Sequence, residues 1–189
     1  MYLSSNNCLT NKFSPDMINN YRCYMIEVTK SLAIDFRARE WCKIPYEGHP
    51  NGCPNWNRNP HCPPNVPIIT DVFDLTKPLW FSIVEFNLLQ HRTNMAIKHP
   101  NWSEKQCNCC LYWQNGVRKQ LKMQCRNALR DNLGSIYTLI PEAMGINVFK
   151  TARNIGIILK RNPRDIIIKI ALIGSHNSDM VIPNSHVHT

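Results

Sequence analysis

One stretch of 28 residues, from Trp41 to Ile68, constrains what this chain can fold into more than any other part of the sequence. It reads WCKIPYEGHPNGCPNWNRNPHCPPNVPI and holds seven prolines and three cysteines. A helix cannot run through it, because each proline removes a backbone N–H and clashes with the preceding turn. A loop of this length is uncommon in a compact domain unless it has a function or is fixed by other bonds. We therefore expect a loop that its cysteines hold in place.

The three loop cysteines predict a metal site. Cys42, Cys53 and Cys62 are spaced C-x10-C-x8-C, and thiolates that share one metal would fix the loop. Zinc ribbons and fingers normally carry two close pairs such as C-x2-C, which this spacing lacks. Wide spacing favours an iron-sulfur cluster, of the four-iron kind, whose sulfur ligands approach from different sides. His49 and His61 lie in the same loop, where they would either replace a cysteine ligand or lie at the surface.

A second group of cysteines offers a fourth ligand. Cys107, Cys109 and Cys110 fall in the first turns of a helix that we expect from Glu104 to Arg130. Adjacent residues on a helix point about 100 degrees apart, so one cluster would use only one of the neighbouring pair, and we choose Cys110, with Cys109 next. Two alternatives stay open: three loop ligands with one open iron position, as a catalytic metal requires, or helix cysteines that are merely small buried hydrophobes.

Other side chains near these cysteines could serve the metal site or have an ordinary structural or binding role. Glu142 and Asn147, in the turn PEAMGIN, would bring a carboxylate to the cluster or form the charged rim of a strand-to-helix turn. Aromatic residues near the cysteines would shield a metal centre from water, which we favour, or stack nucleic-acid bases. The aromatic residues are Trp41, Tyr46, Trp56, Trp80, Trp102, Tyr112 and Trp113.

The net charge of +9 is concentrated in the second half of the chain. Arg118, Lys122, Arg126 and Arg130 recur every four residues and form a basic stripe on the expected helix. Such an excess indicates an anionic partner, of which RNA is one candidate. A solvated basic surface fits the pattern equally well.

The remaining pattern predicts an α/β fold: a mixed sheet of about four to five strands, one long helix and a Cys/Pro-rich metal-binding loop. The long helix begins at a capping box from Ser103 to Gln106. Short helices are expected at 68–75, 87–97 and 147–154, and strands at 31–38, 79–86, 135–140, 157–159 and 165–174. We expect a loose arm over residues 1–20, a single domain over 21–175 and a flexible tail over 176–189.

The sequence carries few signals of location or of a familiar cofactor. The first residues show no basic segment followed by an apolar run, so we expect a cytoplasmic protein with reduced thiols. The motifs that bind nucleotide phosphates, dinucleotides, catalytic zinc or the radical S-adenosylmethionine cluster do not occur. The commonest cofactor enzymes are therefore disfavoured, and the reaction stays open.

Two stretches resemble one known family. GCPNWNRNPHCPPNVP resembles the Cys-rich CPP motif of a family of small bacterial and archaeal proteins of unknown function, described as predicted metal-binding proteins. PEAMGINVFKTARNIGI, which we call the closing motif (residues 141–157), resembles that family's last motif. The resemblance implies metal binding through Cys53 and Cys62, with Cys42 as the preceding cysteine. The family typically has a further cysteine run just before the closing motif, and Ser135 to Pro141 contains none, so a second cluster is not expected.

These observations lead to one main hypothesis and two rivals. The main hypothesis is a protein with one iron-sulfur cluster on Cys42, Cys53, Cys62 and Cys110, for redox or sulfur-handling chemistry on an anionic substrate brought along the basic stripe. A rival is a zinc-stabilised module that binds nucleic acid or protein without catalysis. The last alternative is a globular protein with reduced thiols and no metal.

Overall fold

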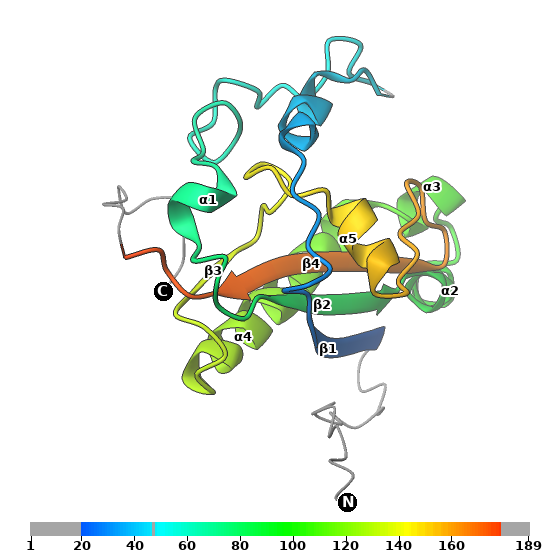
Figure 1. Cartoon of the computed structure of the whole chain (residues 1–189). Helices are drawn as coiled ribbons and strands as arrows, with labels where there is room; N and C mark the ends of the chain where they lie inside the picture. The colour runs from blue at the N-terminus through cyan, green and yellow to red at the C-terminus, as the bar shows by residue number, and fades with distance from the viewer. Residues whose placement is uncertain (1–19, 47, 179–189) are drawn as a thin grey trace, which may run out of the picture.

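The computed structural model describes residues 20–46 and 48–178, which form one four-stranded sheet flanked by helices (Figure 1). The strand order is β1-β2-β4-β3, and all three pairings are antiparallel. The strands are β1 Tyr21–Glu27, β2 Trp80–Asn87, β3 Ile136–Thr138 and β4 Ile166–Gly174. The predicted α/β class and strand number are confirmed, and the strands expected at 79–86, 135–140 and 165–174 correspond to β2, β3 and β4.

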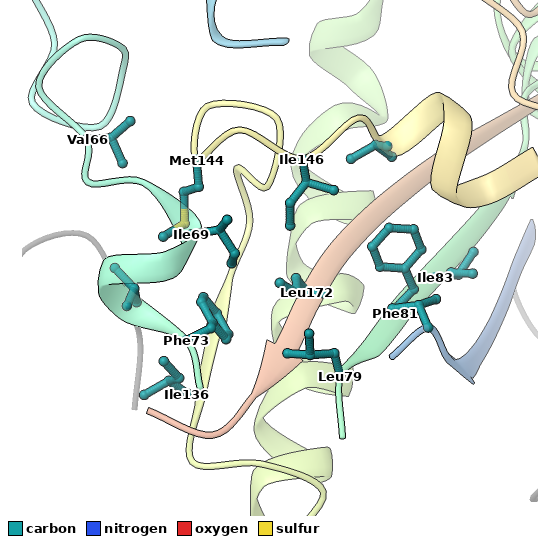
Figure 2. Packing of buried hydrophobic residues seen from close by; sticks show 13 residues of the cluster. Val66, Ile69, Phe73, Leu79, Phe81, Ile83, Ile136, Met144, Ile146 and Leu172 are labelled. Carbon is teal, nitrogen blue, oxygen red and sulfur yellow. The ribbon is translucent and has the colours of Figure 1, made fainter. Parts of the chain in front are cut away.

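One face of the sheet is covered by α1 (Ile69–Val72), α5 (Val148–Asn154) and the closing motif. Successive strand residues point to opposite faces, so Phe81, Ile83 and Leu172 project to this side and pack with Ile69 and Met144. Figure 2 shows these side chains converging from the sheet, α1 and the closing motif. This core joins the end of the Cys/Pro-rich loop to the sheet.

The opposite face of the sheet is covered by α4 (Gln114–Arg130). Its apolar side presents Val117, Leu121 and Cys125, all nearly inaccessible to water, to the strand residues Val84 and Ile173. The sheet therefore separates α4 from the closing motif.

The segment predicted as one helix from Glu104 to Arg130 is broken. The capping box is confirmed: Ser103 Oγ accepts from the Gln106 backbone and the Gln106 side chain reaches back to Ser103. The helix that it starts, α3 (Glu104–Cys107), ends after four residues and is followed by the 3-10 turn η3 (Cys110–Tyr112) and then α4. Trp113 stacks on Phe86 with ring centroids 5.6 Å apart, and burying this ring outweighs the continuation of the helix. The short helix expected before it is α2, Leu88–Lys98.

Two predicted strands do not form. Residues 31–38 make only one bridge, between Ile34 and Ile146. The backbone groups of Ala33 and Asp35 form hydrogen bonds with the closing motif, including α5, instead of with a neighbouring strand. The Asp35 carboxylate then caps the 3-10 helix η2 (Phe36–Lys43). Residues 157–159 have no strand partner among the described residues.

The sequence analysis also missed strand β1. Its residues pack on both faces of the sheet, with Cys23 and Met25 toward the α4 side and Tyr24 and Ile26 toward the other. A strand that is apolar on both sides shows no alternation to detect.

The predicted loose arm and most of the predicted tail lie outside the described residues. At the described end of the chain, His176 forms a bridge with Phe73. None of the helices within residues 20–46 and 48–178 has the length and apolar character needed to cross a membrane.

Candidate metal centre

The first two loop cysteines are held together by their backbones. Cys42 lies in η2, and the Cys53 N–H donates to the Cys42 carbonyl at 2.7 Å. Gly52 makes this approach possible: it has φ +79, and a Cβ there would stand 2.5 Å from the Cys42 carbonyl oxygen. A side chain at residue 52 would therefore push Cys53 away from Cys42.

The three loop thiols lie close enough to affect one another's ionisation. Burial raises the pKa of Cys42, and the Cys53 and Cys62 thiols and the Glu142 carboxyl raise it further. Burial also raises the pKa of Cys62, with a contribution from Cys53. Each pair among the three thiols is thus in electrostatic contact. At neutral pH Cys42 and Cys62 are therefore predominantly thiols, and a metal would displace their protons.

Tight turns fix the third cysteine. The Cys62 N–H donates to the Asn59 carbonyl at 3.0 Å, and the Cys62 carbonyl accepts from Asn65 at 3.0 Å and Val66 at 3.3 Å. Val66 is only 1% exposed and belongs to the core. The loop therefore ends on a rigid anchor four residues after its last cysteine.

Arg39 binds the end of the loop to the closing motif. Its Nη1 donates to the carbonyls of Ala143 at 2.9 Å and Pro67 at 3.4 Å, and its Nη2 to those of Val66 at 2.8 Å and Pro64 at 3.1 Å. One guanidinium thus satisfies carbonyls from segments about 80 residues apart. Sequence analysis did not identify Arg39, because its partners are backbone groups that leave no local pattern.

The closing motif packs directly against the loop. Gly145 has φ +97, and a Cβ there would stand 2.5 Å from the Phe36 ring in η2. The Asp35 N–H donates to the Gly145 carbonyl at 2.8 Å, and the Ile69 N–H to the Met144 carbonyl at 2.9 Å. Figure 2 shows Met144 directed toward Ile69 at the foot of the loop. The closing motif therefore packs on the segments that flank the loop, and it shares a core with Val66 at the end of the loop.

Glu142 connects the thiols to a cavity. Burial raises the pKa of this carboxyl, and Lys169 partly offsets the effect. Glu142 and Lys169 both line a cavity of about 480 Å³ beside β4. β3 pairs only with the last three residues of β4, so the wall of this cavity includes the part of β4 that lies beyond β3. Asn147, the other polar residue of the turn, caps α5 by accepting from the Lys150 N–H at 2.9 Å.

The helix cysteines are not brought to the loop. Cys107 is buried, Cys109 is half-buried between α3 and η3, and Cys110 is exposed. Their segment lies beside α2, on the other side of α5 from the loop (Figure 1). The predicted fourth ligand, Cys110, and its substitute, Cys109, are therefore placed away from Cys42.

The loop histidines take part in local contacts. The His49 ring stacks on Tyr46 at 4.5 Å, and the His61 N–H donates to the Asn59 side chain at 2.8 Å. Trp41, the neighbour of Cys42 in sequence, meets Phe149 edge-on with ring centroids 6.2 Å apart. Across residues 20–46 and 48–178, no three His, Cys, Asp or Glu side chains are positioned to hold a metal ion. Metal binding by the loop thiols would therefore require their side chains to turn toward one another.

The basic stripe lies on the outer side of α4. Arg118, Lys122, Arg126 and Arg130 line a groove of about 590 Å³. The inner side of α4 packs on the sheet face opposite the closing motif. The structure therefore does not bring the stripe to the thiols, contrary to the expectation of a single site that uses both.

No family model matches this chain, and no match was found among curated proteins or solved structures. The resemblance of the loop and the closing motif to a family of predicted metal-binding proteins stays a prediction.

Proposed function

We propose that this protein binds a metal centre through Cys42, Cys53 and Cys62. The proposal is supported by the backbone hydrogen bond that joins Cys53 to Cys42, and by the effect that the loop thiols have on the pKa values of Cys42 and Cys62. The close backbone approach at Gly52 and the hydrogen bonds of Arg39 to the loop carbonyls hold the loop in its folded conformation. A loop so constrained around thiols fits a metal site better than it fits a disulfide, since an odd thiol would be left over.

An iron-sulfur cluster is the leading candidate for the metal centre. Soft thiolate ligands suit iron-sulfur clusters and zinc, and the wide spacing favours the larger object. With Cys110 and Cys109 placed elsewhere, a four-iron cluster would have three cysteine ligands and one open iron position. Glu142, whose carboxyl influences the pKa of Cys42, is a candidate for that position. When bound, such a cluster would supply redox or sulfur-handling chemistry.

An anionic substrate would reach this centre from the cavity that Glu142 and Lys169 line. The cavity is lined by apolar residues of β4, by Lys160, Arg161 and Lys169, and by the carboxyl groups of Glu85, Glu142 and Asp165, of which Asp165 pairs with Lys160. Arg161 and Lys169 would contact a small anion with an apolar part. The substrate route proposed here therefore differs from the basic stripe on α4.

Zinc is the alternative, and it would make the loop a structural clasp in a binding module without catalysis. Three thiolates and one carboxylate or water complete a tetrahedral zinc site. The exposed basic face of α4 favours this second candidate, because it gives such a module a binding surface.

The test is anaerobic purification followed by an absorption spectrum and analysis for iron, zinc and acid-labile sulfide. Iron with sulfide and broad visible absorption is the expected result. Zinc without colour would establish the alternative. Metal-free protein that takes up neither metal after anaerobic reconstitution would refute a metal centre of either kind.

A further inference from the structure

Three aromatic rings form a stack at the surface just before α4. His99 lies on Trp102 with centroids 4.0 Å apart and planes 10° from parallel, and Trp102 lies on Tyr112 at 5.1 Å. Tyr112 is 55% exposed and precedes the first residue of α4 by two positions. The three rings come from the end of α2, the residue before the cap of α3 and the turn η3. Exposed aromatic rings are platforms on which unpaired bases stack.

The groove on α4 follows Tyr112 in the sequence, and its lining begins at Asn115. Arg118 lies in the second turn of the helix, and Lys122, Arg126 and Arg130 follow it at intervals of four residues. At 1.5 Å rise per residue, neighbouring members of the stripe are about 6 Å apart along the axis. That interval is comparable with the separation of adjacent phosphates along an extended polynucleotide strand. A row of cations at such intervals can contact successive phosphates of one strand.

The cations of the groove form no ion pairs with carboxylates of the described residues. Among the residues that the structure describes, the basic side chains that pair with carboxylates are Arg22, Arg37, Lys43, Arg92 and Lys160. None of them lies on α4. The undescribed residues contain only three acidic side chains in all, Asp16, Glu47 and Asp179. The chain itself therefore has no acidic segment that could neutralise the groove, which points to an external polyanion.

We propose that this face of α4 binds single-stranded nucleic acid, with phosphates along Arg118, Lys122, Arg126 and Arg130 and a base on Tyr112. A duplex keeps its bases paired, so it would use the cations but not the ring. An acidic peptide would likewise leave the ring without a role. The proposal is independent of the metal centre, because the sheet lies between the two sites.

The first experiment measures binding of the full chain to a labelled RNA oligonucleotide of about 12 nucleotides by fluorescence anisotropy. For a single strand, log K falls with log salt with a slope of about −0.7 per phosphate contacted. Four contacts predict a slope of about −3, so affinity should fall about 50-fold between roughly 50 and 200 mM salt. A DNA strand of the same sequence tests whether the sugar matters, and its binding would also support the proposal.

Two variants separate the phosphate contacts from the stacking. The first variant replaces all four cations of the stripe, and its slope of log K against log salt should approach zero. It combines Arg118→Gln, Lys122→Gln, Arg126→Gln and Arg130→Gln. The matched control carries Lys30→Gln, Lys77→Gln, Lys150→Gln and Arg153→Gln, which remove the same charge from exposed positions elsewhere and should keep most of the slope. Tyr112→Ala should weaken binding about tenfold with an unchanged slope.

Several outcomes would overturn the proposal. A salt-independent affinity in the parent protein would exclude a phosphate interface whether or not any variant folds. If the control variant weakened RNA binding as much as the groove variant, binding would depend on net charge alone and not on the groove. Duplex DNA or polyglutamate that binds as tightly as the single strand, with no effect of Tyr112→Ala, would make the face a general polyanion or acidic-protein surface.

Discussion

The chain contains two groups of three cysteines, and the structure treats them differently. Cys42, Cys53 and Cys62 are widely spaced in sequence, yet their thiols influence one another. Cys107 to Cys110 are close in sequence, yet one is buried, one is half-buried and one is exposed. The difference arises from the backbone: the Cys53 N–H donates to the Cys42 carbonyl, whereas Cys107 ends α3, Cys109 has an extended backbone and Cys110 begins η3.

Proximity in sequence is therefore a poor guide to a shared site. Arg39 binds the end of the loop to the closing motif, so the loop group should depend on bonds to a segment distant in sequence. The helix group should depend on local packing alone. The predictions below test these two dependencies.

Replacing Arg39 should have the largest effect on stability. Arg39→Met leaves three partly buried carbonyls and one exposed carbonyl without their donor, which predicts a loss of about 3–5 kcal/mol in the free energy of unfolding. Urea denaturation measures it. The control is Arg37→Met, because Arg37 is 88% exposed and pairs only with Asp35 nearby, and it should change stability by less than about 0.5 kcal/mol. Similar losses of stability in both variants would show that the bonds of Arg39 do not hold the loop to the closing motif.

Gly52 and Gly48 offer a matched pair in the loop. Both have positive φ, but a Cβ at Gly48 meets nothing within 4 Å, whereas one at Gly52 meets the Cys42 carbonyl at 2.5 Å. Gly48→Ala should cost about 1 kcal/mol, the strain of the left-handed backbone. Gly52→Ala should cost about 2–3 kcal/mol and should also lower metal occupancy. Equal costs and full occupancy in both variants would show that the close approach of Cys53 to Cys42 is unimportant.

Cys125, on α4, should behave as a buried hydrophobe. Burial raises the pKa of Cys125 to about 11 from an ordinary value of 9.0. The folded state therefore retains a proton that the unfolded state loses above pH 9, so this stabilisation is complete below pH 9 and falls as pH rises toward 11. Between pH 8.5 and 11, the free energy of unfolding should fall by about 2 kcal/mol more in the parent protein than in Cys125→Ala. Parallel stability curves for parent and variant would contradict this, and exposed Cys110→Ala serves as the control.

Local signals in the sequence predicted local structure well. The β-branched and aromatic run that became β2, the Ser103 capping box and the proline-rich loop each follow from residues within a few positions of one another. The break at Trp113 was not predicted, because it follows from stacking on Phe86, a residue distant in sequence. Arg39 was missed for the same reason. The metal site expected on Cys42, Cys53 and Cys62 stays a prediction, whereas the single helix expected to carry Cys110 does not form.

The most direct test of the central claim is the metal content of two single variants, prepared anaerobically beside the parent. Cys62→Ser should lose most of the bound metal and its visible absorption, because a thiolate of the loop group is gone. Cys110→Ser, an exposed position away from the loop, should retain the parent's metal and spectrum. Retention of metal by Cys62→Ser, or its loss from Cys110→Ser, would contradict a metal centre built on the loop thiols alone.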